Sequence, residues 1–371
     1  MFFYYIFSAY TIPGIYIYFR INHLLIPKGQ KLIFSFFFLL LLAAFPAAEM
    51  LSHNETGNLL SPLLRFGYYT MPFMLYLFLL VLIFDIFLLF NLLFKWLYTG
   101  FLKSTTFRRR GLIIAFIVPT LVVFYGILNF NSIRVSDYTI EISARSSKLQ
   151  NVSVAFVSDF HIGDLTSIKF IERFVAKMES INPDIILFGG DLLEGDRDDI
   201  RTSHIESLFR QLQAPYGIYG VFGNHEHHGG RSSSDFYQQA GIKQLHDTSL
   251  LIDGSFYLIG RQDTRNRNRL SIDDLINNLQ DHYPILLLDH RPTDIDAVSQ
   301  SSVDIQLSGH THHGQLFPFN LISKHIYEIS WGNKKIGSTH FFVTSGIQLW
   351  GPPVRTIGKS EIMLINVKFI Q

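Results

Sequence analysis

The apolar residues of this chain are concentrated in its first third, where they form four long runs. Each run is close to the roughly 20 residues that a helix needs to cross a bilayer. A cleaved signal peptide is the alternative for the first run, but no positively charged segment precedes it and no small-residue cleavage site follows it. We therefore predict an all-α transmembrane region over residues 1–131, with helices at about 2–19, 32–51, 70–96 and 111–128.

Residues 132–371 show a different pattern, in which short apolar stretches alternate with polar loops and helix-like segments. The partial alternation of residues 133–142 indicates an entry strand. Residues 167–180 and 271–280 read as helices. Strands that alternate with helices predict a layered α/β domain. The further strands are expected at 152–158, 184–190, 217–224, 256–260, 284–290, 303–310, 340–346 and 361–367.

Basic residues are unevenly distributed between the apolar runs. Arg20, Lys28 and Lys31 follow the first run, and five basic residues follow the third, whereas Arg65 is the only one after the second. Because positive loops stay in the cytoplasm, we predict a multi-pass protein of the cell (inner, cytoplasmic) membrane with residues 132–371 outside the cytoplasm. This orientation reverses if one run does not span.

Asp85 lies in the middle of the third run. A carboxylate within a membrane is a functional hypothesis by default, here a transport role. No second charged residue stands in the middle of the other runs to match it. The better-supported interpretation is therefore a protonated or hydrogen-bonded side chain that faces neighbouring helices.

The composition narrows the chemistry further. The 371 residues include no cysteine, so disulfides, thiolate metal sites and a cysteine nucleophile are excluded. Any metal ion must be held by His, Asp, Glu or Asn. The formal net charge of +1 argues against a nucleic-acid partner bound through bulk electrostatics.

Five predicted strands of the second region end at residues that bind metals well. In open α/β sheets, ligands bind beyond the carboxyl ends of the strands. A single histidine in such a place is more often structural, but five strand ends with the same chemistry predict a metal site. The residues are Asp159, His161, Asp191, Asn224, His225, His290, His310 and His312.

The ordered motifs D-x-H, GD, GNHE, a lone histidine and GHTH resemble those of the calcineurin-like metallophosphoesterases. The resemblance covers roughly residues 135–371, and the ending TSGIQLWGPPVRTIGKSEIMLI is similar to that of the bacterial membrane-associated YkuE-like group. Two departures are visible. His313 occupies a position where that group tends to have glycine, and it could narrow the mouth of the site. Glu194 stands where aspartate is more usual.

The resemblance implies a four-layer αββα sandwich with two divalent metal ions bridged by Asp191. The first metal would be held by Asp159, His161, Asp191 and His312, and the second by Asp191, Asn224, His290 and His310. Oxygen and imidazole ligands suit Mn, Fe or Zn, and we favour Mn. By the same resemblance, His225 lies near the leaving oxygen and donates a proton or a hydrogen bond, whereas Glu226 is structural.

These features predict a membrane-anchored metallophosphoesterase that hydrolyses a phosphomonoester, phosphodiester or pyrophosphate through a metal-bridging hydroxide. Four membrane spans exceed the need of a simple tether and point to a lipid-linked or envelope substrate. Arg261 and Arg355 could join Asn224 and His225 in binding phosphate, because guanidinium groups bind phosphate as charged forks. The alternative is a non-catalytic membrane sensor or scaffold with a metal- or phosphate-binding domain.

Overall fold

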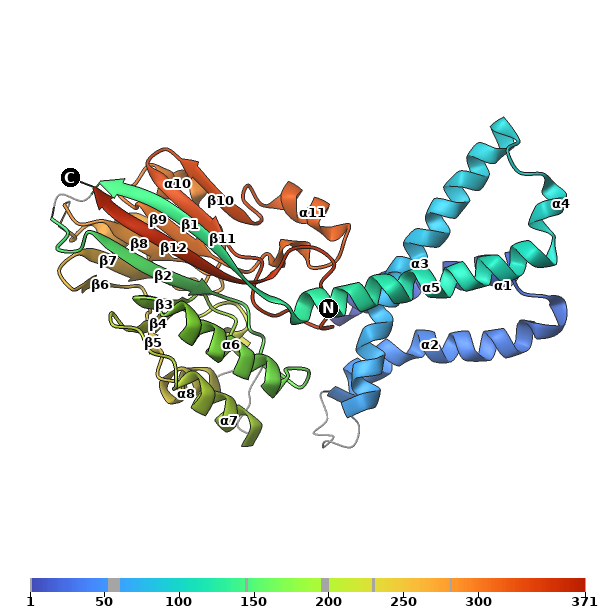
Figure 1. Ribbon diagram of the computed structural model, residues 1–371, viewed down its shortest axis with the longest axis horizontal. Helices are drawn as coiled ribbons and strands as arrows, with labels where there is room; N and C mark the ends of the chain where they lie inside the picture. The colour runs from blue at the N-terminus through green and yellow to red at the C-terminus, as the bar shows by residue number, and fades with distance from the viewer. Residues whose placement is uncertain are drawn as a thin grey trace. The chain divides into compact units, whose positions relative to one another are not determined.

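The computed structural model describes residues 2–52, 61–143, 146–194, 200–228, 231–280 and 282–370. The chain forms two compact units, drawn in Figure 1. The first comprises residues 1–128 and Gly351–Thr356, and the second comprises Asn129–Trp350 and Ile357–Gln371. The sequence-based division placed all of 132–371 together, whereas the segment Gly351–Thr356 is grouped with the N-terminal helices.

Long helices cover the four apolar runs of the first unit. Three segments are long and apolar enough to cross a membrane, namely Lys28–Leu51, Pro62–Phe94 and Thr105–Asn131. The first helix, which is rich in tyrosine and contains Arg20, is not among the spans found in the described residues. The helices are α1 (Phe2–Leu24), η1 (Lys28–Gln30), α2 (Lys31–Ser52), α3 (Ser61–Phe94), α4 (Thr99–Leu102) and α5 (Thr105–Asn131).

Asp85 has an ionic partner, which corrects the expectation that no second charge faces it. The guanidinium of Arg20 in α1 donates from Nε to Asp85 Oδ2 at 2.6 Å and from Nη2 to Oδ1. The Tyr16 hydroxyl also donates to this carboxylate. The apolar run stops at residue 19, but α1 continues to Leu24, so Arg20 lies one turn beyond Tyr16 on the same helical face. A bidentate ion pair therefore joins α1 to α3.

Removing the Asp85 charge should destabilise the helical unit. Asp85→Asn leaves the Arg20 cation without its counter-charge, and loss of one partner of a half-buried ion pair costs about 1 kcal/mol or more. We expect a lower unfolding midpoint for the full chain in detergent micelles, with partial recovery in the double variant Asp85→Asn/Arg20→Gln. Asp137→Asn, at an exposed position of the second unit, is the control. An Asp85→Asn protein as stable as the parent would contradict the structural role of this pair.

The second unit contains two six-stranded mixed sheets. The first has the order β1-β12-β2-β3-β4-β5, and the second has the order β10-β11-β9-β8-β7-β6. The strands are β1 (Ile133–Ser143), β2 (Asn151–Val157), β3 (Ile185–Phe188), β4 (Ile218–Gly220), β5 (Lys243–Gln244), β6 (Thr248–Ile252), β7 (Phe256–Gly260), β8 (Ile285–Leu288), β9 (Ile305–Ser308), β10 (Gly332–Ile336), β11 (Thr339–Val343) and β12 (Ser360–Ile370).

Three apolar cores separate four layers, which confirms the αββα sandwich. In β2, Val154 and Phe156 enter the core between the sheets, whereas Ala155 and Val157 enter the core beneath the outer helices. Burial on both faces explains why the central strands are continuous apolar runs. The helices are α6 (Ile168–Ile181), α7 (Ile200–Phe209) and α8 (Arg231–Gln239) on the first sheet, and α9 (Ile272–Ile276) and α10 (Ile295–Ser299) on the second (Figure 1).

Parallel pairing sets the position of the site. Strands β2, β3 and β4 are parallel neighbours in the first sheet, and β8 and β9 are parallel neighbours in the second. Parallel neighbours deliver their carboxyl ends to the same edge, so the loops that follow these five strands can meet there. The described chain also contains η3 (Glu226–His228), η4 (His312–Gly314) and α11 (Phe319–Ile326).

Candidate metal centre

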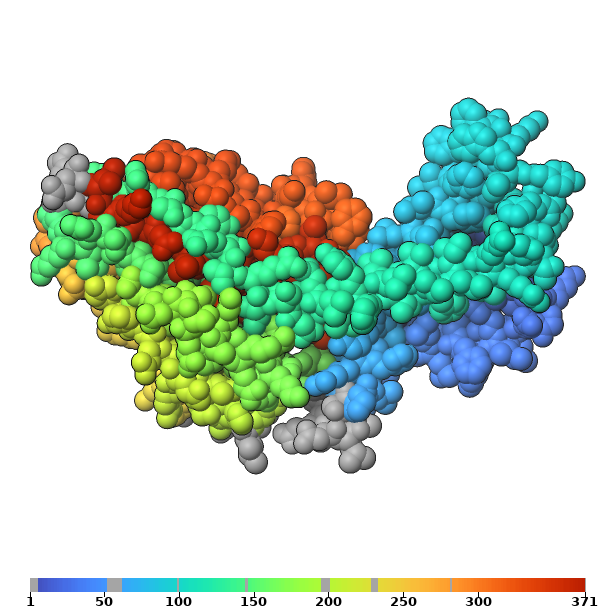
Figure 2. Space-filling view, viewed as in Figure 1, coloured from blue at the N-terminus to red at the C-terminus, as the bar shows by residue number. Residues whose placement is uncertain are grey.

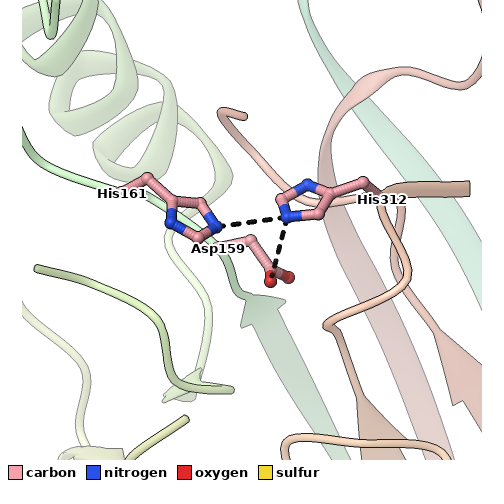
Figure 3. A group of neighbouring side chains, drawn as sticks. All are labelled: Asp159, His161 and His312. Carbon is pink, nitrogen blue, oxygen red and sulfur yellow. Dashed lines mark hydrogen bonds and ion pairs between the residues drawn. The ribbon is translucent and has the colours of Figure 1, made fainter. Parts of the chain in front are cut away.

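The loops after β2 and β9 bring one group of metal-type ligands together, as Figure 3 shows for Asp159, His161 and His312. The Nε2 atoms of His161 and His312 lie 3.1 Å apart, and His312 Nε2 lies 3.6 Å from Asp159 Oδ1. The loops meet closely because residue 309 is glycine, where a Cβ would lie 2.3 Å from Asp159 Oδ2. Two imidazole nitrogens and a carboxylate oxygen thus converge on one point, as the ligands of a cation do.

Asp191, His290 and His310 form a second group of the same kind. His290 Nδ1 lies 2.7 Å from the carbonyl oxygen of Gly189, which can only accept, so this nitrogen carries the proton. His290 Nε2 then faces Asp191 Oδ2 at 3.1 Å. Such a hydrogen bond to the outer nitrogen is the usual way in which proteins orient a metal-binding histidine.

Asn224 completes the set of predicted ligands. It follows β4 between Gly223 and His225, and the His225 amide donates to Asp191 Oδ1 at 2.8 Å. The buried Asn224 Oδ1 is one of the described polar atoms that have no hydrogen-bond partner. Buried polar atoms are normally satisfied, so this atom fits a site that a divalent cation would occupy.

The backbone adopts a left-handed conformation at the residues of this edge. Non-glycine residues at such φ values cost on the order of 1 kcal/mol each, although aspartate and histidine tolerate them better than most residues. Outliers of this kind persist where the surrounding structure fixes them, and they gather at functional sites. The φ angles are 63° at Asp159, 45° at His161, 53° at Asp191, 69° at His310 and 47° at His312.

Glu194 contacts two histidines at once, a role that sequence reasoning missed. Its carboxylate accepts hydrogen bonds from His161 Nδ1 at 2.8 Å and from His225 Nδ1 at 2.9 Å. Burial alone would raise the pKa of Glu194, but these two bonds lower it to about 2. Glu194 therefore stays ionised and fixes both rings with Nε2 directed away from it. The only sequence signal was its place three residues after Asp191.

Glu226 holds the loops after β3 and β4 together. Its buried carboxylate accepts the backbone N–H groups of Asp191 at 2.9 Å and Gly223 at 2.7 Å, together with those of Leu192 and Leu193. Burial and the nearby Asp191 raise the pKa of Glu226 to about 7, against the effect of these N–H donors. Its contacts are those of a structural residue.

The electrostatics of the site reflect several titratable groups buried together. Burial raises the pKa of Asp159, whereas His290 lowers that of Asp191 well below its usual range despite burial. Burial lowers the pKa of His290, but Asp191 outweighs it and the result is about 10. Burial, aided by His290, lowers the pKa of His310 to about 3. In the absence of a cation, a proton on His290 therefore balances the buried carboxylates.

The two arginines predicted to bind phosphate are both buried. Arg261 donates from Nη1 to Asp294 at 2.7 Å and to Asp289 at 3.3 Å, and from Nε to the Leu270 carbonyl at 2.9 Å. Its guanidinium thus binds carboxylates of its own domain. Arg355 is completely buried and belongs to the helical unit, where its amide donates to the Gly126 carbonyl.

The sequence suggested that His313 could narrow the mouth of the site. The structure buries this side chain against Trp331. Its ring is buried, with its centroid 5.0 Å from that of Trp331, and its Nδ1 lies 3.2 Å from Ser330 Oγ. Its φ of 49° is in the left-handed region, which explains why a glycine also suits this position.

Comparisons with known proteins agree with this architecture. Residues 152–314 match the family model of the calcineurin-like phosphoesterases. An uncharacterized metallophosphoesterase of Aquifex aeolicus is 28% identical over 259 residues, which are 68% of this chain and 98% of that protein. The metallophosphoesterase YkuE of Bacillus subtilis is 28% identical over 247 residues, 64% of this chain and 86% of its own length.

A relative from an animal is named as a transmembrane protein. The transmembrane protein with metallophosphoesterase domain of Danio rerio is 27% identical over 283 residues, 71% of this chain. The alignment spans 64% of the fish protein's length. The sandwich, the ligand-bearing strand ends and these matches define a metal-dependent phosphoesterase. The chain carries a calcineurin-like phosphoesterase domain over residues 152–314, as its motifs predicted, and YkuE is among its relatives.

Loss of the Glu194 charge should weaken metal binding. In Glu194→Gln the two histidines lose the acceptor that fixes their rings, and changes of this kind typically cost about 10–100-fold in metal affinity. Calorimetric titration of the purified chain with Mn²⁺ measures the effect. Glu194→Asp keeps a carboxylate and should retain more affinity, and Glu172→Gln on the exposed face of α6 is the matched control. Equal affinities for the parent and Glu194→Gln would refute the orienting role.

Proposed function

We propose that this protein is a membrane-anchored phosphohydrolase that uses two divalent cations, Mn favoured, to cleave a phosphoester. The observation that carries the proposal is the convergence of ligands from both sheets on Asp191. This residue belongs to one group with His290 and His310 and to another with His161 and His225. A carboxylate shared by two groups suits a pair of cations about 3.5–4 Å apart.

We assign the ligands from these groups and from that of Asp159, His161 and His312, and we assign His225 to the substrate instead of a cation. Asp159, His161, Asp191 and His312 would hold the first cation. The second would be held by Asp191, Asn224, His290 and His310. When bound, two such cations supply Lewis acidity toward the phosphoryl oxygens and an acidified water as the nucleophile.

His225 is the residue placed to supply the proton that the leaving oxygen needs. Its Nε2 lies 4.0 Å from Asp191 Oδ2, and its side chain is 22% exposed, so a substrate bound at the cluster can reach it. Glu194 accepts the Nδ1 proton of His225 and so directs Nε2 away from itself. The imidazolium donates its Nε2 proton to the departing alkoxide and becomes neutral. General-acid help of this kind contributes roughly 10²–10⁴ in rate.

Replacing His225 should therefore separate catalysis from metal binding. We expect His225→Ala to lose about 10²–10⁴ in turnover, because only the proton donor is removed, while bound metal stays at the parental level. The assay uses the full chain in detergent with Mn²⁺ and both mono- and bis-p-nitrophenyl phosphate, which also separates monoesterase from diesterase activity. Metal content is measured on the same samples.

Two further variants complete this test. Asp191→Asn should lose both metal and turnover, whereas His204→Ala on the exposed side of α7 should change neither. Full turnover in His225→Ala would refute its role as the acid. A parent that binds two metals but hydrolyses neither ester would favour the sensor or scaffold alternative.

We also propose that the domain faces the outside of the cytoplasm and acts on a lipid or envelope phosphoester. The basic turn between α1 and α2 and the basic connection around α4 lie at the same end of the helical unit, whereas α5 ends toward the other (Figure 1). The ion pair with Asp85 neutralises Arg20, so Arg20 does not count toward the orientation. The basic residues between α3 and α5 still do. Positive-inside orientation of α5 then places Asn131 outside whether or not α1 spans the bilayer.

Reporter fusions test this orientation. Alkaline phosphatase, which is active only outside the bacterial cytoplasm, should be active when fused after Gln371 and inactive when fused after Lys103. The basic connection between α3 and α5 is expected to stay in the cytoplasm because of its charge. The reverse pattern of activity would place the domain in the cytoplasm and remove the argument for an envelope substrate.

A further inference from the structure

Helix α11 buries two polar residues against the domain and exposes its apolar residues. Asn320 and Ser323 are buried. A helix on the surface of a soluble domain shows the opposite arrangement, with its apolar stripe facing the core. The outward residues form what we call the α11 apolar face: Phe317 at 49% exposure, Phe319 at 41%, Leu321 at 57%, Ile322 at 54% and Ile326 at 65%.

Three residues of the α11 apolar face follow one another along the helix. Phe319, Ile322 and Ile326 are spaced by three and four residues, so they line up along one side of the helix. The orange segment that carries this helix lies on the molecular surface in Figure 2. Single exposed apolar residues are ordinary, whereas a continuous patch marks a surface that binds something apolar. Lys324 and His325 are exposed on the same helix, as on helices that lie at a membrane surface.

We propose that the α11 apolar face inserts into the interface of the lipid bilayer that the helical unit spans. Two short connections tie the second unit to that bilayer. The span in α5 ends at Asn131 and β1 begins at Ile133, so a single residue separates them. The segment Gly351–Thr356 returns to the helical unit, where the Arg355 amide donates to the Gly126 carbonyl at 3.0 Å.

The charge of α11 agrees with a lipid surface as its occupant. The ammonium of Lys324 can extend along its aliphatic stem toward phosphate headgroups while the apolar residues enter the acyl boundary. Anionic lipids attract such a side chain. A protein partner would instead require complementary polar contacts around the rim of the patch.

Both ends of helix α11 contact the loop that follows β9 and carries His310 and His312. Gly314 has a φ of 73°, and a Cβ there would lie 2.4 Å from the amide nitrogen of Asn320, so the loop packs directly on the start of the helix. At the other end, the Tyr327 ring lies edge-on to the His310 ring, with 6.1 Å between centroids. An inserted α11 therefore holds the cluster beside the headgroups. This places a membrane phosphoester as the substrate, a step that rests on the proposed function.

The absence of cysteine allows a direct test on the full chain. Ile322→Cys, labelled with the polarity-sensitive fluorophore NBD, is reconstituted at one chain per lipid nanodisc. We expect blue-shifted emission and quenching by lipids that carry a nitroxide near the top of the acyl chain. Lys177→Cys, on the exposed face of α6, is the matched control and should show neither effect.

Two results would overturn the proposal. Emission at position 322 like that at 177 would show that the α11 apolar face stays in water. A blue shift without lipid quenching would show that protein covers it, either a second copy or other parts of the same chain. The double variant Ile322→Ser/Ile326→Ser should lower turnover of vesicle-borne phospholipid several-fold and spare p-nitrophenyl phosphate. Inactivity of the parent on all esters would refute the proposed function, while the quenching result would still decide insertion.

Discussion

The catalytic edge of this protein depends on the buried carboxylate of Asp191. Its Oδ2 faces His290 at 3.1 Å and both His161 and His225 at 4.0 Å, while its Oδ1 accepts the His225 amide. A buried negative charge is costly unless groups of opposite charge surround it. The four-layer sandwich meets this requirement by ending parallel strands of both sheets at one edge, so imidazoles from separate loops gather around one carboxylate.

A second carboxylate keeps Asp191 in place. Glu226 accepts the amide of Asp191 and that of Gly223, which lie on the loops after neighbouring strands. Two buried acids so close together disfavour each other's ionisation, which is part of why the pKa of Glu226 is raised to about 7. The backbone N–H groups that donate to Glu226 offset this repulsion, because each N–H dipole points at the carboxylate. The GNHE motif thus places a ligand-type residue, a histidine that contacts Glu194 and a structural carboxylate in succession.

Much of this arrangement could be predicted from the sequence, because a metal ligand at the end of an apolar strand is a local signal. The features that were missed depend on contacts between distant segments. Glu194 contacts histidines 33 and 31 residues away. The carboxylate partners of Arg261 stand 28 and 33 residues further on, so the sequence did not reveal them. Arg20 was read as a loop residue because the apolar run ends before the helix does. Helix α11 has no strand-like or core-facing pattern to reveal it.

The left-handed backbone at the ligand positions has a consequence for how such a site can be lost. Aspartate and histidine tolerate φ values between 45° and 69°, whereas valine and isoleucine do not. A substitution that removes a ligand without disturbing the sandwich is therefore restricted to glycine, asparagine and a few other residues. The backbone therefore limits which residues can replace these side chains in related chains that have lost activity. Such chains are expected to keep residues that tolerate a positive φ at the same positions.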